Sequence, residues 1–585
     1  MKTVVVLAAI VALSLAANFP TPSQHEVETK SVDGGYVARQ KAVLDLFKNV
    51  DEQFDHEEEW YRVGNEYDPE ASINKYTNKE VVEDFMKLYR SGFLPKYEVF
   101  SIFDERVLEE TVALFKLFYY ANNFLDFYKT AAWARVHLNK NQFIYTFYIA
   151  IIQRPDTQDM VIPAPYEIYP ELFTNSETIF KVFRVKVQDG LLNEKLASND
   201  GIVKENNNYI LYANYSSYRT YGPEEQRLAY FTEDVGMNSC YFYFHSYLPF
   251  WINSENHILK KRLGELWVFY YQQLLARYYL ERLSNGLGEI PDFSWKKPIK
   301  TRYTPFMSTL QYPFIQRNSE YRIPVEKYNE EIQFLETFEK NFLQYMQRGM
   351  FKAYGQETNI RSPESLNFVG NYWQSNPNLY SQTEPRKLWK SYENIARHLL
   401  SAVPESFEER TVLPSALNFY QTSLRDPIFY QLYSKILKYI KLFKENIYHF
   451  SHTYLKFYGV KINDVQVDKL VTFFDFFEYE ITNGVYRSNT EIKNITKRYL
   501  VRQPRLNHKP FTVTVDYWLE YRALETLIDN KPFGYPFDRP LRHETPFRVP
   551  NILFKDVLIY FEGTHFPYQM NNPFHGPPKN QVSKH

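Results

Sequence analysis

Two short stretches decide the fold of this 585-residue chain. Residues 230–249 read YFTEDVGMNSCYFYFHSYLP, and residues 422–430 read TSLRDPIFY. They stand out because the common catalytic motifs are missing from the sequence. It has no G-x-S-x-G hydrolase elbow, no glycine-rich phosphate loop and no H-E-x-x-H metal motif. These two stretches are thus the most specific features that the chain offers.

Aromatic residues are frequent in these stretches and throughout the chain. With 50 Tyr, 47 Phe and 8 Trp, rings make up 18% of all residues, roughly double the usage of an ordinary globular protein. The 44% of hydrophobic residues can bury enough surface to exclude intrinsic disorder. A net charge of -1 provides no overall field that would attract nucleic acid. At about 150 residues per domain, the length predicts roughly two to four domains.

Residues 1–16 have the pattern of a secretory signal peptide. Lys2 supplies the positive charge, and residues 4–13 form an apolar run that is too short to cross a bilayer. Small side chains precede a cleavage point, which we place after Ala16, with Ala17 as the alternative. No later stretch is apolar enough to span a membrane. We therefore predict a secreted chain without membrane insertion.

Two glycosylation sequons fit the secretory route. They predict N-glycosylation at Asn214, which is followed by Tyr-Ser, and at Asn494, which is followed by Ile-Thr. Cys240 is the only cysteine and cannot form an intrachain disulfide. The stability of the secreted chain must therefore come from core packing or from oligomerisation.

The hydrophobic pattern predicts helices up to about residue 450 and strands beyond it. Residues 141–154 are apolar nearly all round, which predicts a buried helix, and residues 329–350 show one regular apolar face. The proline-rich residues 156–169 predict a linker between two helical regions. Residues 511–515 alternate with period two, as in a strand. Further helical stretches are expected over residues 80–94, 105–137, 259–282 and 427–450.

The two quoted stretches strongly resemble signature segments of the arthropod hemocyanin superfamily. Three other segments resemble that family and occur in its order: residues 281–285 (ERLSN), 501–509 (VRQPRLNHK) and 529–534 (DNKPFG). The resemblance implies a mainly α, multidomain fold with two helical domains followed by an immunoglobulin-like β-sandwich. The expected parts are a signal peptide over 1–16, an all-α domain over 17–155, a helical middle domain over 156–450, the sandwich domain over 451–570 and a disordered tail over 571–585.

Hemocyanins hold two copper ions with six histidines, and the resemblance assigns those six positions in this chain. The first copper's positions carry Tyr241, His245 and Tyr271, and the second copper's positions carry Asn367, Asn371 and Tyr433. Only His245 is a histidine. Because phenols and amides are poor copper ligands at neutral pH, we expect no copper and no other cofactor. We expect the tyrosines to fill the cavity and the two asparagines to hydrogen-bond among these rings and to His245.

The copper-free, aromatic-rich branch of this superfamily is the insect hexamerins of the arylphorin type. Similarity to them implies a non-enzymatic storage protein of larval haemolymph that forms homo- or hetero-hexamers with related chains. It also implies later uptake into fat body, with an uptake receptor as a further partner, and use of Tyr and Phe for cuticle. A second hypothesis is a haemolymph carrier of small lipophilic ligands or hormones. A copper oxygen carrier or phenoloxidase is disfavoured because five of the six histidines are absent.

One departure from the family concerns the sandwich domain. The strand-like residues 511–516 are followed at once by residues 517–529, whereas relatives have a long run of strands between these parts. We therefore expect the domain to be internally shortened near residues 516–517. The remaining strands would then have unpaired edges, which favour irregular association.

Overall fold

The structure of the chain is a computed structural model that describes residues 34–519 with internal gaps. The longer gaps are residues 49–57, 188–200, 253–261, 375–389, 402–412, 452–459 and 486–496. Several sequence predictions lie outside the described residues: the signal peptide with Ala16 and Ala17, the sequon at Asn494, the segment 529–534 and the tail over 571–585.

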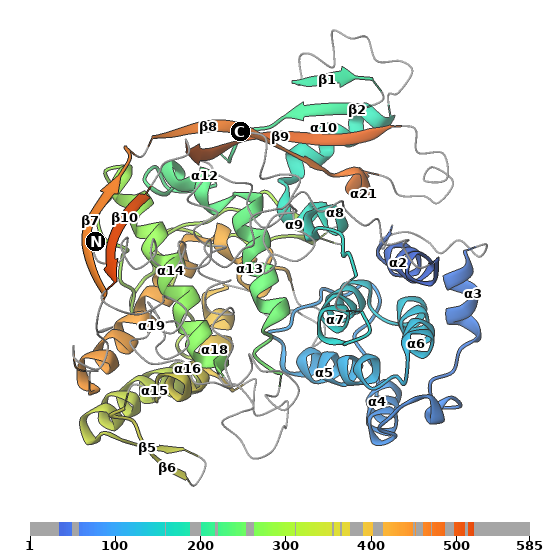
Figure 1. The fold of residues 1–585 in the computed structure, drawn as a ribbon, viewed down its shortest axis with the longest axis horizontal. Helices are drawn as coiled ribbons and strands as arrows, with labels where there is room; N and C mark the ends of the chain where they lie inside the picture. The colour runs from blue at the N-terminus through green and yellow to red at the C-terminus, as the bar shows by residue number, and fades with distance from the viewer. Residues whose placement is uncertain are drawn as a thin grey trace.

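The first part of the chain is a helical bundle, coloured blue to cyan in Figure 1. Its helices are α2 (Gly34–Phe47), α3 (Glu59–Glu66), α4 (Glu80–Arg90), α5 (Glu105–Tyr119), α6 (Phe124–His137) and α7 (Lys140–Gln153), with a 3-10 turn at Ile73–Lys75. Helix α7 is buried on all sides, as its apolar sequence predicts.

The expected single helical stretch over residues 105–137 is wrong, because the structure breaks it into α5 and α6. The break follows from local capping: the Asn123 side chain accepts a hydrogen bond from the Asp126 backbone N–H at 3.0 Å and starts α6. Ala121, in the break, pairs with Tyr76 as an isolated β-bridge. The turn lets α6 fold back beside α7 without a proline or glycine.

The middle of the chain contributes most of the remaining helices. They are α8 (Pro165–Ile168), α9 (Pro170–Phe173), α10 (Ser176–Val187), α12 (Ala229–Thr232), α13 (Val235–Tyr247), α14 (Leu263–Ser284), α15 (Asn329–Arg348), α16 (Leu366–Gln374), α18 (Tyr392–Leu400) and α19 (Pro427–Asn446). Short 3-10 turns lie at Glu225–Leu228, Ala416–Asn418 and Ser423–Arg425. The apolar face predicted for α15 is confirmed, because Ile332, Leu335, Phe338, Phe342 and Met346 are all buried.

The predicted linker over residues 156–169 is packed into the molecule. Met160, Ile162 and Tyr166 are buried, and the backbone N–H and C=O of Val161 both pair with the Gln40 side chain of α2. Helix α7 of the bundle also packs against α13, where the rings of Tyr148 and Phe242 lie 5.3 Å apart. The two helical regions therefore share one continuous core.

The strands form one four-stranded mixed sheet and three pairs among the described residues. The sheet has the order β1 (Ile202–Glu205), β2 (Asn208–Tyr212), β9 (Arg498–His508), β8 (Thr472–Glu480). The pairs are β7 (Val460–Val467) with β10 (Val513–Leu519), β3 (Ser308–Thr309) with β4 (Tyr312–Pro313), and β5 (Met350–Ala353) with β6 (Gln356–Asn359). A short helix, α21 (Thr482–Val485), follows β8.

This sheet crosses the boundary that the sequence pattern suggested near residue 450. Strand β2 comes from the region predicted to be helical and pairs in parallel with β9, so that Tyr209 faces Tyr499. The sheet runs along one edge of the molecule, at the top of Figure 1. Hence the C-terminal region is held to the helical body by backbone hydrogen bonds as well as by side chains.

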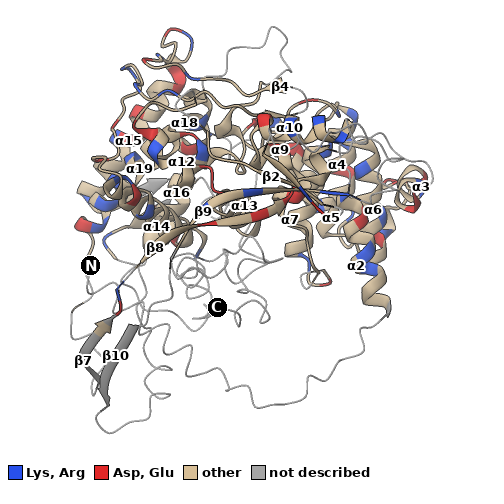
Figure 2. Ribbon diagram, turned by 90° about the horizontal axis from the view of Figure 1, so that it is seen from above, with Lys and Arg blue, Asp and Glu red and all other residues tan. Residues whose placement is uncertain are grey.

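Positive and negative residues are interspersed over the outer helices, as Figure 2 shows for α2, α15 and α19. This mixture agrees with the near-zero net charge of the chain. No helix in the described part of the chain combines the length and the apolar character needed to cross a membrane.

Candidate functional site

The positions assigned to copper ligands lie on helices α13, α14, α16 and α19, and an aspartate side chain caps the start of α13 and of α19. Helix α13 begins at Asp234, whose carboxylate accepts a hydrogen bond from the Met237 backbone N–H at 2.8 Å. Ser391 caps α18 in the same way, and Asp426 caps α19 just ahead of Pro427. These caps fix the axial position of each helix, and therefore the depth at which its side chains enter the core.

Tyr241 and His245 of α13, Tyr271 of α14 and Tyr433 of α19 converge at one place in the core. The hydroxyls of Tyr241 and Tyr271 share a hydrogen bond of 2.6 Å, and Nε2 of His245 lies 3.1 Å from the Tyr271 hydroxyl. The ring of Tyr433 stacks on that of Tyr271 with 4.0 Å between centroids. His245 stacks on Tyr420 at the same distance. The expectation that tyrosine rings fill this region is confirmed.

An arginine stands between these phenols. Arg397 of α18 has no exposed surface, and its Nη2 donates to the hydroxyls of Tyr241 at 2.5 Å and Tyr433 at 2.8 Å. Its Nη1 donates to the Leu417 carbonyl and to the Ser423 hydroxyl, each at 2.9 Å. Its Nε lies 3.1 Å from the Tyr433 hydroxyl. Every nitrogen of the guanidinium therefore has a partner.

Glu393, one helical turn before Arg397, balances its charge. Their closest nitrogen–oxygen distance is 3.4 Å, and Tyr433 donates its hydroxyl proton to the same carboxylate oxygen of Glu393. The cluster thus contains one cation, one carboxylate and a set of neutral phenols. Sequence reasoning missed both charged residues, although a glutamate and an arginine four positions apart on one helix were a usable signal.

Burial governs the protonation states in the cluster. It raises the pKa of Tyr241 to about 12, although the nearby Arg397 cation works in the opposite direction. It raises the pKa of Tyr271 and of Tyr433 well above the ordinary phenol value. Burial, reinforced by Arg397, lowers the pKa of His245 well below 6.5. The phenols and the imidazole are therefore all neutral at physiological pH.

This donor set does not fit a copper pair. Copper favours several neutral imidazoles or thiolates, whereas this cluster offers one imidazole, protonated phenols and a permanent cation. The carboxylate of Glu393 is already bound to Arg397 and Tyr433. Nowhere in the described part of the chain do three or more His, Cys, Asp or Glu side chains gather as a metal site would require.

The two asparagines do not make the contact that we expected: Asn367 bonds elsewhere, and the buried Oδ1 of Asn371 has no hydrogen-bond partner among the described residues. His245 makes its hydrogen bond to Tyr271, and its Nδ1 has no partner among the described residues, so the predicted bonds from Asn367 and Asn371 to His245 are wrong. Oδ1 of Asn367 instead accepts from the backbone N–H of Gly264 at 3.1 Å, at the start of α14. The reason is that α16 crosses the end of α14 so closely that its amides meet backbone there.

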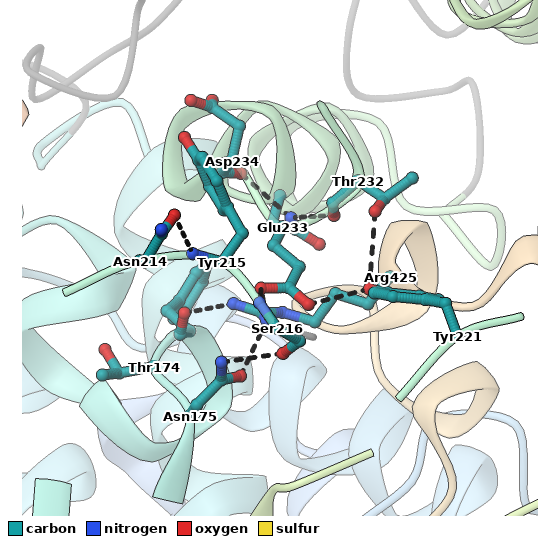
Figure 3. A network of polar contacts seen from close by, with 12 residues as sticks. Thr174, Asn175, Asn214, Tyr215, Ser216, Tyr221, Thr232, Glu233, Asp234 and Arg425 are labelled. Atoms are coloured by element: carbon teal, nitrogen blue, oxygen red, sulfur yellow. Dashed lines mark hydrogen bonds and ion pairs between the residues drawn. The ribbon is translucent and has the colours of Figure 1, made fainter. Parts of the chain in front are cut away.

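The two signature stretches meet at a second buried network, shown in Figure 3. The carboxylate of Glu233 accepts hydrogen bonds from the Tyr221 hydroxyl at 2.9 Å and from the Ser216 backbone N–H at 3.0 Å. Arg425 lies 4.0 Å from Glu233 and donates to the carbonyl of Phe173 and to the Asn175 side chain. The network joins four segments that are distant in sequence, so these signature residues have a structural role.

The first sequon borders this network. The Asn214 side chain is exposed and accepts a hydrogen bond from the next backbone N–H, that of Tyr215. The Ser216 hydroxyl accepts from the Asn175 amide at 2.9 Å, and the Tyr215 hydroxyl donates to the carbonyl of Pro504. The asparagine thus faces solvent while its two sequon neighbours are bound to the core (Figure 3).

Comparison with known proteins places these features in a family. Residues 36–159 match the family model described as hemocyanin, all-alpha domain, and residues 164–440 match that of the hemocyanin, copper containing domain. Residues 449–520 and 518–561 match two parts of the hemocyanin, ig-like domain. The family's domain order thus agrees with the fold class expected from the sequence.

Several relatives are similar over the whole chain. Arylphorin subunit alpha of Manduca sexta is 44% identical over 704 aligned positions, which cover 100% of both chains. Arylphorin of Antheraea pernyi is 42% identical over 706 positions, again covering 100% of both chains. Hexamerin 70b of Apis mellifera is 36% identical over 83% of this chain and 70% of its own length.

Solved structures show the same fold at lower sequence identity. A crustacean hemolymph-type prophenoloxidase matches with a TM-score of 0.64 and 18% identity over 82% of this chain and 73% of its own. A scorpion hemocyanin matches with a TM-score of 0.62 and 22% identity, over 82% of this chain and 70% of its own. On its fold, its three domain matches and its full-length relatives, the chain belongs to the hemocyanin superfamily and, within it, to the arylphorin-like hexamerins.

Proposed function

We propose that this chain is a storage protein of larval haemolymph that supplies amino acids, above all Tyr and Phe, for metamorphosis and cuticle formation. The observation that carries the proposal is what occupies the copper-ligand positions. Tyrosine rings and a buried arginine fill that place in an otherwise preserved fold. The chain contains 50 Tyr and 47 Phe, and packed rings occupy the place of the metal site. Such a chain is suited to serve as a store of aromatic amino acids.

The proposal includes secretion and assembly. The signal-like residues 1–16 and the exposed Asn214 support export with N-glycosylation. The relatives named hexamerin support a hexamer, built from this chain alone or together with related storage chains. Uptake into fat body through a receptor would then return the stored residues to the tissue.

The storage role is tested by tracing labelled tyrosine from the protein into the cuticle. Purified protein carrying ring-deuterated tyrosine is injected into last-stage larvae, and cuticle is hydrolysed and analysed by mass spectrometry after the moult. We expect the label in cuticular catechols and a loss of intact protein from haemolymph. Equal doses of a labelled secreted protein of ordinary composition are the control. Intact labelled chain persisting in the adult, with unlabelled cuticle, would contradict a storage role.

We also propose that the chain is not an enzyme. We expect purified protein to contain no stoichiometric copper and to leave catechols unoxidised after copper is supplied. Elemental analysis measures the copper content, and an oxygen-uptake assay measures the oxidation of catechols. A relative that carries all six histidines is the positive control. Two coppers per chain together with oxygen uptake would show a phenoloxidase. Stoichiometric lipophilic molecules released by solvent extraction would favour the carrier hypothesis.

A further inference from the structure

The guanidinium of Arg397 lies between one phenol from each of the two groups of positions that the resemblance assigns to the two copper ions. Its Nη2 contacts Tyr241, from the first group, at 2.5 Å and Tyr433, from the second group, at 2.8 Å. Tyr271 of the first group stacks directly on Tyr433 of the second, with centroids 4.0 Å apart. One side chain therefore joins phenols from both assigned groups.

The surroundings of Arg397 are built for a permanent cation. Its five N–H donors are matched by phenol oxygens, a hydroxyl and a backbone carbonyl. Aromatic rings surround the charged carbon, the nearest being Phe103 with its centroid 4.5 Å away. Glu393 supplies the balancing charge from the preceding turn of the same helix. A guanidinium fits this arrangement because it is always charged and its donors lie in one plane.

We propose that Arg397 takes the place of the copper pair: it is the internal cation around which the phenols of both former ligand groups are arranged, and it closes the cavity to metal ions. The loss of metal binding then rests on two changes, the loss of imidazoles and the gain of a fixed charge. Restoring histidines alone would leave the charge in place, and this positive charge would repel a metal cation bound beside it.

The proposal can be tested with few substitutions, because one of the three histidines of the first group is already present. His245 is native and its Nε2 lies 3.1 Å from the Tyr271 hydroxyl, which is itself 2.6 Å from that of Tyr241. The double variant Tyr241→His/Tyr271→His therefore completes the first group of three histidines. Co²⁺ is a suitable probe, because its visible absorption reports binding by imidazoles in a site of the zinc type.

We expect the full-length double variant to show no Co²⁺ absorption while Arg397 is present. The triple variant with Arg397→Gln should bind about one equivalent, whereas the triple variant with Arg397→Lys, which keeps the charge, should bind none. The matched control adds Arg282→Gln to the double variant, because Arg282 is a buried cation paired with Glu225 outside the cluster. That control should also bind none. Co²⁺ binding by the double variant as tight as in the Arg397→Gln triple variant would overturn the proposal.

Single substitutions test the same point if the histidine variants fold poorly. If the positive charge organises the phenols, Arg397→Lys should be tolerated better than Arg397→Met. This ranking should hold even though a methionine side chain is less polar than a lysine side chain. We expect melting temperatures to fall by about 5 °C or more for Met and by roughly half of that for Lys. Secreted yield gives the ranking for variants too unstable to purify. Equal or higher stability of Arg397→Met would show that the side chain only fills a cavity.

Discussion

At the scale of single residues, one buried ion pair joins segments that lie far apart in the sequence. Asp426 of the second signature stretch binds Arg317 through both carboxylate oxygens, at 2.5 and 2.7 Å, with both side chains almost fully buried. The same carboxylate caps α19. One carboxylate thus serves both the ion pair and the helix cap.

We predict that Asp426→Asn lowers the free energy of unfolding by about 3–5 kcal/mol, because it leaves the buried Arg317 without a counter-charge. The asparagine can still cap α19, so the loss reports the ion pair. Asp292→Asn is the matched control, since its partner Lys438 is largely exposed and such pairs contribute little. Urea unfolding of the three proteins gives the comparison, and equal losses for both variants would contradict the assignment.

Glu167 is a half-buried carboxyl whose pKa is raised. Burial and then the nearby charge of Glu480 raise its pKa from 4.5 to about 7. Between these two values the folded state holds the proton more tightly than the unfolded state. Its stabilising contribution is therefore complete below about pH 4.5 and is lost as the pH rises through 7.

We predict that Glu167→Gln removes this pH dependence. Relative to the native protein, the variant should gain stability between pH 5 and pH 8, by about 2–3 kcal/mol at most. Melting temperatures of both proteins at the two pH values give the measurement, because other titrating groups cancel in the difference. Parallel curves for the two proteins would show that the carboxyl is already ionised at pH 5.

At the scale of elements, the helices around the cluster are held at close distance by small residues. A Cβ on Gly264 of α14 would lie 2.0 Å from the carbonyl oxygen of Asn367, and a Cβ on Gly370 of α16 would lie 2.1 Å from the carbonyl oxygen of Gly264. Glycine is needed at both positions because backbone meets backbone there. This crossing sets where α14 lies, and hence where Tyr271 meets the cluster.

We predict that Gly264→Ala lowers the stability by about 3 kcal/mol, although alanine favours helices more than glycine does. Gly288→Ala is the control, because a Cβ added there would meet no described atom within 4 Å and the backbone is unstrained. Circular dichroism melts of both variants give the comparison. A neutral effect of Gly264→Ala would mean that α16 can move away from α14 at little cost.

At the scale of the whole molecule, the sequence predicts a C-terminal domain that is internally shortened near residues 516–517. The alignment with the Manduca sexta arylphorin subunit spans 704 positions against 585 residues here, and the ig-like domain matches in two pieces that meet at residues 518–520. Strand β10 runs through this junction, and its register with β7 shifts between Asp516 and Tyr517. Strand β8 lies at the edge of its sheet and exposes Phe473, Phe474 and Phe476.

We predict that this chain assembles less cleanly than a full-length relative. A closed hexamer needs the same contact patches on every copy, whereas an aromatic edge strand favours irregular pairing. Light scattering on the purified chain should show polydisperse species, and Phe474→Lys/Phe476→Lys, which blocks the edge, should reduce them. A sharp species of about six chains for the unmodified protein would show that the shortened domain does not impair assembly.

Much of the local structure was predictable from the sequence. The buried face of α15, the buried helix α7 and the start of α19 at Pro427 all follow from hydrophobic spacing and proline position. The resemblance of the two signature stretches indicated the class of protein, and the residues at the six assigned positions led us to expect no copper. These features are local or compositional, so they need no knowledge of which segments meet.

The tertiary structure alone decided the rest. The parallel pairing of β2 with β9 and the capping of α14 by Asn367 join residues that are far apart in sequence. The clearest case is Arg397, whose sequence context suggests only a charged position on a short helix. Its function as the central cation depends on Tyr241 and Tyr433, which two other helices bring within hydrogen-bond distance. The energy of a buried charge depends on which partners lie within hydrogen-bond distance of it. Only the folded chain sets those distances, so the sequence alone does not contain them.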